Sequence, residues 1–190
     1  MAGEPGWRMD LPQGWVSWRP GSPDLDALSA AAAGNALARR SLVRRLRTAE
    51  REARALPGQV LQIGVRVADP RSGTVSASMT LLEWERPTTD DKPLNARRHL
   101  TALEALEPDP ERVYRHREAT IEKVPAGQLV LRNEVWRPRR RMGWVVELET
   151  TLFPRDSESM YELGVRSRHG DLQPQLMADL SLMAHSLHIT

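Results

Sequence analysis

The five histidines are the residues best suited to metal binding or proton transfer. They are His99, His116, His169, His185 and His188. No two of them have the spacing of a helical metal pair, and a chain without cysteine has no thiolate ligands. His185 and His188 fall near the end of the last expected helix, where protonated imidazoles suit the negative end of the helix dipole. The histidines therefore predict no metal site and no cofactor.

Two glutamate pairs have the spacing of a carboxylate acid–base pair. Glu83 and Glu85, like Glu147 and Glu149, stand two residues apart in expected strands. Side chains two apart on a strand lie on the same face of the sheet, so each pair could share a proton. Ordinary solvent-facing alternation is the simpler interpretation, and we expect these glutamates to face water.

Motifs for other enzymatic chemistry are absent from the sequence. It contains no Gly-x-Ser-x-Gly elbow, no glycine-rich phosphate loop and no cysteine nucleophile. His116 with Glu118 would support an enzyme only if the two lined a deep cleft. We therefore expect a non-enzymatic protein and name no catalytic residue.

Tryptophan is the main large aromatic residue, with six copies against one phenylalanine. Trp136 and Trp144 flank an arginine-rich turn, Trp136-Arg137-Pro138-Arg139-Arg140-Arg141, at an expected hairpin tip. Core filling is the simpler role for tryptophan. Its apolar body and single N–H donor also suit a recognition groove.

Arginine forms a second basic feature on the first long expected helix. Arg40, Arg44, Arg47, Arg51 and Arg54 recur on one helical face, opposite an apolar face. The two basic features together give our candidate binding residues. These candidates are Trp136, Arg137, Arg139, Arg140, Arg141, Trp144, Arg40, Arg44, Arg47 and Arg51.

The charge balance limits what these arginines imply. The net charge is only +2, and only two basic residues are lysines, a bias typical of a GC-rich, actinobacterial type of genome. A solvated face is thus the simpler interpretation. If the arginines bind, an acidic protein surface is favoured over nucleic acid or anionic lipid, because the sequence has no nucleic-acid motif.

Hydrophobic periodicity and turn residues predict the elements that must position these side chains. Their order is strand, helix, two strands, helix, four strands and helix. The expected segments are strand 15–18, helix 22–56, strands near 61–67 and 74–86, helix 94–106, strands 116–123, 128–137, 143–153 and 159–167, and helix 172–187. The predicted class is α+β, a largely antiparallel sheet of six to seven strands flanked by three helices, which makes an α/β/α sandwich.

Local signals set the expected boundaries. Ser22-Pro23-Asp24 suits a helix start, and Gly34-Asn35 can divide the long helix that follows. Residues 1–13 are expected to be a flexible N-terminal lead-in, and residues 14–190 one domain. Without cysteine, an N-terminal apolar signal or an apolar span, we expect a cytoplasmic protein with no integral membrane contact.

Three short motifs resemble the PsbP-like α/β/α sandwich superfamily, which includes the actinobacterial LpqN-type and the DcrB-type proteins. The motifs are Leu11-Pro12-Gln13-Gly14-Trp15, Val124-Pro125-Ala126-Gly127 and Met183-Ala184-His185-Ser186-Leu187. The resemblance implies an accessory, chaperone-like or ligand-binding protein. Many members are lipoproteins with a signal peptide and a lipidated cysteine, and this sequence shows neither.

The resulting expectation is a non-enzymatic interaction protein of a chaperone-like, secretion-associated or immunity type. Its partner would be a protein, with homo-oligomerisation through an edge strand as a variant. The alternative is a small-ligand or lipid-binding protein with a pocket between sheet and helix. A closed apolar cavity would favour this alternative, while a tightly packed core with an exposed patch would favour the first.

Overall fold

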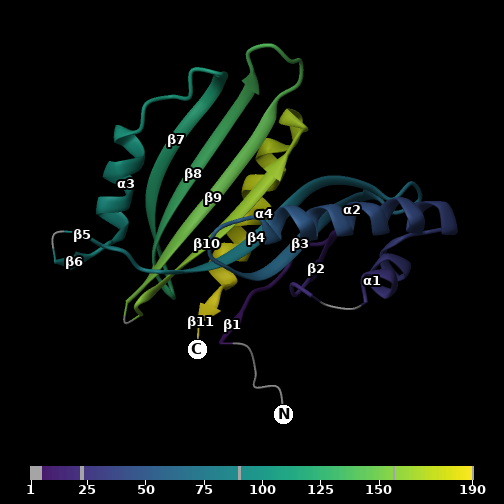
Figure 1. The fold of residues 1–190 in the computed structure, drawn as a ribbon, viewed down its shortest axis with the longest axis horizontal. Helices are drawn as coiled ribbons and strands as arrows, with labels where there is room; N and C mark the ends of the chain where they lie inside the picture. Colours follow the sequence, from purple (N-terminus) through teal and green to yellow (C-terminus); the bar gives the residue numbers. More distant parts are fainter. Residues whose placement is uncertain (1–5, 22–23, 90, 156, 190) are drawn as a thin grey trace.

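The computed structural model describes residues 6–21, 24–89, 91–155 and 157–189. Seven strands form one antiparallel sheet in the order β2-β3-β4-β10-β9-β8-β7, as Figure 1 shows. The strands of this sheet are β2 (Trp15–Trp18), β3 (Gln59–Asp69), β4 (Thr74–Glu85), β7 (Arg112–Val124), β8 (Gly127–Pro138), β9 (Val145–Pro154) and β10 (Ser159–Ser167). The expected α+β class and strand number are confirmed.

Four α-helices and two small strand pairs complete the described chain. The α-helices are α1 (Leu25–Ala32), α2 (Ala36–Arg54), α3 (Ala96–Ala105) and α4 (Gln173–Ser186), with a 3-10 turn η1 (Gly170–Leu172) before α4. Two small pairs join β1 (Trp7–Arg8) to β11 (His188–Ile189) and β5 (Thr88–Thr89) to β6 (Lys92–Pro93). Among the described residues, no helix is long and apolar enough to cross a membrane.

Helix α4 covers one face of the sheet. Its apolar stripe, including Leu176, Leu180 and Met183, is buried against inward-facing residues such as Leu148 and Leu163. Each Å² of apolar surface removed from water stabilises a fold by about 25 cal/mol. This layer holds the largest of the three clusters of buried residues, so it is the main stabilising core. Trp15 Nε1 of β2 donates a hydrogen bond to the buried Asp179 carboxylate of α4 (2.8 Å), and Arg66 Nε of β3 pairs with the same oxygen (3.3 Å), so two strands satisfy this buried charge.

Helices α2 and α3 lie on the opposite face, at its two ends. Leu42 and Leu46 of α2 pack on Ile63 and neighbouring residues of β2 and β3. The N-terminal end of α3, through Ala96, packs on β8 and β9. Figure 1 shows α3 and α2 near the two edges of the sheet, on the face toward the viewer, with α4 behind the sheet. The expected sandwich is therefore correct.

The expected three helices become four because the first long helix divides. The backbone of Asn35 is extended, which interrupts the helix. Its side chain caps α2 by accepting a hydrogen bond from the Ala38 N–H (2.9 Å). Asp24 caps α1 by accepting one from the Ala27 N–H (2.8 Å). Ser22 and Pro23, expected to start the helix, lie outside the described residues.

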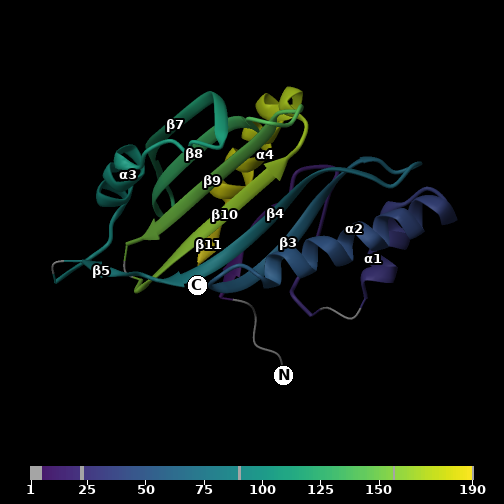
Figure 2. The ribbon, with the colours of Figure 1, turned by 45° about the horizontal axis from the view of Figure 1, so that its top comes forward.

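The expected flexible lead-in over residues 1–13 has a fixed place from Trp7 onward. Trp7 pairs with Ile189 in the β1–β11 ladder, and Met9 and Leu11 pack on the core beneath α4. The Asp10 N–H also donates to the Ser186 hydroxyl (3.0 Å). The start of the described chain is therefore held against the end of α4 and the strand that follows it (Figure 1). Figure 2 shows the same fold turned by 45°.

Candidate functional site

The sheet face shared by α2 and α3 is open between the two helices, and charged side chains occupy this strip. Figure 1 looks onto the strip, where the parts of β8, β9 and β10 between α2 and α3 carry no helix above them. We call its charged residues the charged floor. They are Arg112, Arg117, Arg132, Glu134, Glu147, Glu149 and Glu162.

Strand alternation brings these residues to one face. On β8, Arg132, Glu134 and Trp136 point to the open side, while the residues between them point toward α4. The ladder register then sets Arg132 opposite Glu149 and Glu134 opposite Glu147 on β9. Cross-strand neighbours of opposite charge attract each other, so the register also favours the network.

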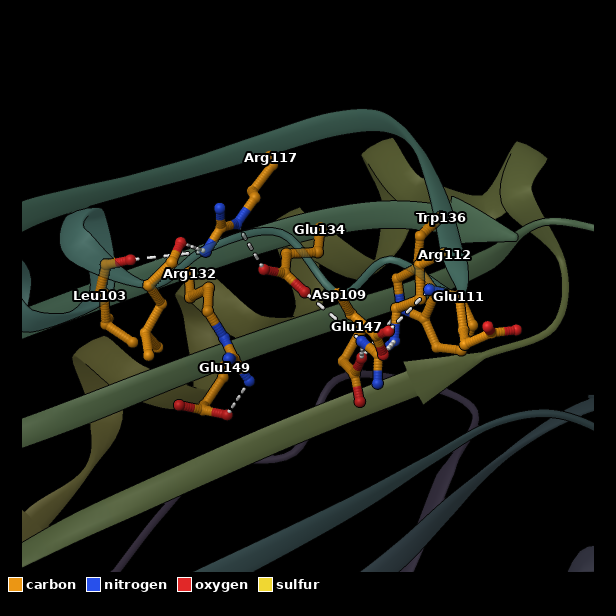
Figure 3. A network of polar contacts seen from close by, with 11 residues as sticks. Leu103, Asp109, Glu111, Arg112, Arg117, Arg132, Glu134, Trp136, Glu147 and Glu149 are labelled. Carbon is orange, nitrogen blue, oxygen red and sulfur yellow. Dashed lines mark hydrogen bonds and ion pairs between the residues drawn. The ribbon is translucent and has the colours of Figure 1, made fainter. Parts of the chain in front are cut away.

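Arg112 and Trp136 form one end of the network. The Arg112 guanidinium lies over the Trp136 ring, 3.9 Å from its centroid, a close cation–π contact. Both residues also bind Glu147 Oε2: Arg112 Nη1 at 3.2 Å and Trp136 Nε1 at 2.9 Å. Arg112 Nε further contacts Asp109 Oδ2 at 3.1 Å, and its Nη1 lies 3.8 Å from Glu134 Oε2, so one arginine contacts four neighbours (Figure 3).

Arg117 and Arg132 form the rest of the network, which Figure 3 shows running from the end of α3 to β9. Arg117 Nε pairs with Glu134 Oε1 at 3.2 Å, and its Nη2 donates to the Leu106 carbonyl at 2.9 Å. Arg132 Nη2 pairs with Glu149 Oε2 at 2.6 Å, a short charge-assisted hydrogen bond. Glu134 is only 4% exposed, and its two arginines, Arg112 and Arg117, satisfy this buried carboxylate.

Burial raises the pKa of two carboxyl groups of the floor, Glu162 and Glu149. It raises the pKa of Glu162 to about 7, with the Glu149 carboxylate as the second cause. Burial likewise raises the pKa of Glu149, against the opposing pull of Arg132. Burial opposes the charged form of Arg132 too, but the carboxylates around it, Glu149 first, raise its pKa. Arg132 therefore stays charged, whereas Glu162 exchanges its proton near pH 7.

Two hollows flank the charged floor. The α2 hollow, of about 210 Å³, lies between α2 and strands β9 and β10, with Gly164 and Glu162 in its lining. The α3 hollow, of about 200 Å³, lies between the C-terminal end of α3 and strands β7 and β8. Arg132 lines the α3 hollow and Glu149 lines the α2 hollow, so their ion pair separates the two.

A third hollow, of about 360 Å³, lies at the opposite end of the sheet beside Arg86, Lys123 and Arg155. None of the three is lined by a residue of α4. In the described part of the chain, no group of three or more histidine, aspartate or glutamate side chains is arranged to hold a metal ion. The arginines and glutamates of the floor suit ion-pair recognition instead.

The structure separates the residues of the predicted arginine hairpin. Trp136 is 7% exposed and contacts Arg112 and Glu147 of the charged floor, so it is no free recognition surface. Trp144 is half-buried against the α4 core, with the Arg137 guanidinium 5.7 Å from its ring centroid. Arg139 is tied to the chain through its Nε and the Pro110 carbonyl. Arg140 and Arg141 are exposed at the tip.

The predicted arginine face of α2 is a separate surface. Arg40, Arg44, Arg47 and Arg51 are all exposed on the helix. Helix α2 packs on β3 and β4, whereas the hairpin joins β8 and β9. The two basic features that the sequence grouped are therefore not brought together.

The sequence interpretation missed most of the charged floor. Glu147 and Glu149, expected to face water, are half-buried and ion-paired, and this expectation is wrong. Arg112 fell in an expected loop, because β7 begins four residues earlier than predicted. His116 and Glu118 do contact each other, at 3.3 Å, but they lie on the edge strand β7, where His116 is half-buried and Glu118 is exposed, and no deep cleft of the described chain surrounds them. The available signal for the charged floor was the alternation of charged residues along neighbouring strands. Strands that face solvent show the same alternation, so this pattern did not distinguish the floor from ordinary surface.

Comparison with known proteins supports the architecture. No protein-family model matches the chain, and no curated protein matches it. LpqN of Mycobacterium tuberculosis, a protein involved in cell envelope biogenesis, matches 100% of this chain and 87% of its own, with a TM-score of 0.54 and 11% identity. Cyanobacterial PsbP (CyanoP) from Synechocystis sp. PCC 6803 matches 97% of this chain and 87% of its own, at 0.49 and 13% identity. The chain therefore shares the α+β fold of LpqN, as the resemblance to PsbP-like proteins predicted.

Proposed function

We propose that this chain is a non-enzymatic accessory protein that binds a protein partner at the open sheet face between α2 and α3. One observation carries the proposal: the two sheet faces are built differently. The α4 face is sealed by an apolar core, while the opposite face holds the charged floor and its two hollows.

The energetics of the charged floor support a recognition role. Partly buried ion pairs contribute little net stability, and apolar residues of similar size often serve a core as well or better. Glu134, Glu147 and Glu149 are nevertheless held at fixed positions by three arginines. Fixed charges on an open face give specificity for a partner of complementary shape and charge.

The size of the two hollows beside the charged floor favours a protein partner there over a free small ligand, whereas the third hollow, of about 360 Å³, lies at the opposite end of the sheet. Drug-sized ligands occupy pockets of about 300–1,000 Å³. The α2 hollow has about 210 Å³ and Leu56, 40% exposed, at its rim. A single side chain protruding from a partner fits this space.

The fold of LpqN gives a broad context for this proposal. LpqN is involved in cell envelope biogenesis, and an accessory role of that general kind is what we propose for this chain. The cytoplasmic location stays a prediction from the sequence. It is tested by fractionating the native host and following the chain with an antibody.

Filling the α2 hollow tests the binding proposal. Gly164 lines its floor, its φ is not positive, and a Cβ there would meet only Thr80 Oγ1, at an ordinary 3.6 Å. Gly164→Trp therefore fills the hollow while leaving the sheet intact. Leu182→Trp, at a 48% exposed position on α4, is the matched control.

The measurement is a quantitative pull-down from the native host, with circular dichroism of each bait to verify folding. We expect one stoichiometric protein with the wild-type chain and with Leu182→Trp, and at least a tenfold loss with Gly164→Trp, because about 1.4 kcal/mol changes binding tenfold. Equal recovery by all three baits would show that the partner binds elsewhere.

A further inference from the structure

We propose that the outward face of α2 docks onto a phospholipid bilayer that carries anionic headgroups. This surface is distinct from the charged floor, so the inference goes beyond the proposed function. Its core is the arginine stripe, which we define as Arg40, Arg44, Arg47, Arg51 and Arg54.

The arginine stripe is continuous and points to solvent. Its members follow one another at intervals of three and four residues, the spacing that keeps side chains on one helical face. All five are exposed, and Leu37, 77% exposed, extends the same face toward the start of the helix. From Arg40 to Arg54 the stripe spans about 21 Å at 1.5 Å per residue.

Packing fixes the direction in which the stripe faces. Leu42 and Leu46, on the other side of α2, are fully buried against the sheet. The helix therefore has no freedom to turn its arginines inward. Figure 2 shows α1 and α2 at one end of the molecule, with α2 lying along the outside of β3 and β4.

Three arginines of the stripe are free to bind. Arg47 contacts Asp26 at 3.6 Å, and Arg54 pairs with Glu50 at 2.6 Å. Within the described residues, Arg40, Arg44 and Arg51 have no ion pair or side-chain hydrogen bond to the protein. Their guanidinium groups thus keep their donors for phosphate oxygens, which they can bind in a bidentate way.

The shape of the surface favours a bilayer over a folded partner. None of the three hollows is lined by an arginine of the stripe, so none of them offers a socket for a partner's side chain on this surface. Protein interfaces usually centre on apolar or aromatic anchors and are poor in charge at the core. A plane of phosphates can instead follow a straight row of arginines, with Leu37 reaching the interface at one end.

Vesicle sedimentation tests the proposal with the full chain. The probes are vesicles of phosphatidylcholine alone and of phosphatidylcholine mixed with phosphatidylglycerol. The test variant combines Arg40→Gln, Arg44→Gln and Arg51→Gln. The control combines Arg139→Gln, Arg140→Gln and Arg141→Gln, which removes the same charge from the hairpin tip.

We expect the wild-type chain to sediment with the anionic vesicles only, and less at high salt because ions screen the contact. Each basic residue near an anionic membrane contributes about a fivefold gain in binding, so the test variant should bind about 100-fold more weakly. The control variant should bind like the wild type. In the otherwise wild-type chain, Leu37→Ser should also weaken binding to the anionic vesicles. It should not change the salt dependence of binding, because it removes no charge.

Three outcomes would overturn the proposal. One is failure of the wild-type chain to sediment with anionic vesicles. Another is an equal loss in the test and control variants, which would indicate a general charge effect. The third is binding to a DNA duplex but not to vesicles, which would make nucleic acid the ligand of the stripe.

Discussion

Glu162 shows how one residue of the charged floor affects stability. Its pKa of about 7, against an ordinary 4.5, arises first from burial and then from the Glu149 carboxylate. Between these two values the folded chain holds a proton at Glu162 that the unfolded chain has lost. The contribution of Glu162 to the free energy of unfolding therefore falls as the pH rises from about 5 to about 8.

Glu162→Gln should remove this penalty. Glutamine keeps the shape without the charge, so we expect the variant to be more stable than the wild type at pH 8, by about 1–2 kcal/mol after solvent screening, and equal to it at pH 5. Urea denaturation at both pH values measures the difference. Glu122→Gln, at an exposed position of β7, is the control and should change neither value. A gain for Glu162→Gln that is the same at both pH values would contradict the assignment.

At the scale of elements, the turn between β3 and β4 holds α2 in place. Asn35 Nδ2 donates to the Arg71 carbonyl of this turn (2.7 Å), and the Gly34 N–H donates to the Pro70 carbonyl (2.8 Å). Gly73 has a φ of +67° and lies so close to α2 that a Cβ would overlap the Ala38 carbonyl oxygen. The turn and the start of α2 therefore form one packed unit.

Comparing two glycines separates the packing of this turn from its backbone conformation. Gly143 also has a positive φ, +99°, but a Cβ there meets nothing within 4 Å. Gly143→Ala should cost about 1 kcal/mol for the backbone alone. Gly73→Ala should cost about 2 kcal/mol more, because the Ala38 carbonyl must move. Chemical denaturation of both variants checks this, and equal losses would mean that the turn does not press on α2.

At the scale of the whole molecule, the sequence predicted the fold better than the site. Strand alternation, turn residues and the apolar stripe of α4 are local signals, and they were enough for the strand count and the α+β class. The charged floor depends on which strands become neighbours. Arg132 meets Glu149 only because β8 pairs with β9 in one register, and neither residue alone differs from an ordinary surface charge.

The N-terminal segment is a second case in which long-range contacts decide. Leu11 lies in a polar stretch that reads as loose chain, yet it packs on the core that α4 covers. Leu11→Ala should therefore destabilise the protein by about 1–2 kcal/mol, less than the 2–5 kcal/mol of a fully buried leucine.

Leu37→Ala, at the 77% exposed position of α2, is the matched control and should change stability by less than about 0.5 kcal/mol. Thermal or urea unfolding compares the two. Because a flexible lead-in would make both substitutions equally harmless, a loss confined to Leu11→Ala would show that this segment is part of the folded core. Leu11→Ala should also raise the rate of amide hydrogen exchange in α4, because the N-terminal segment contacts the C-terminal end of this helix through Asp10 and Ser186.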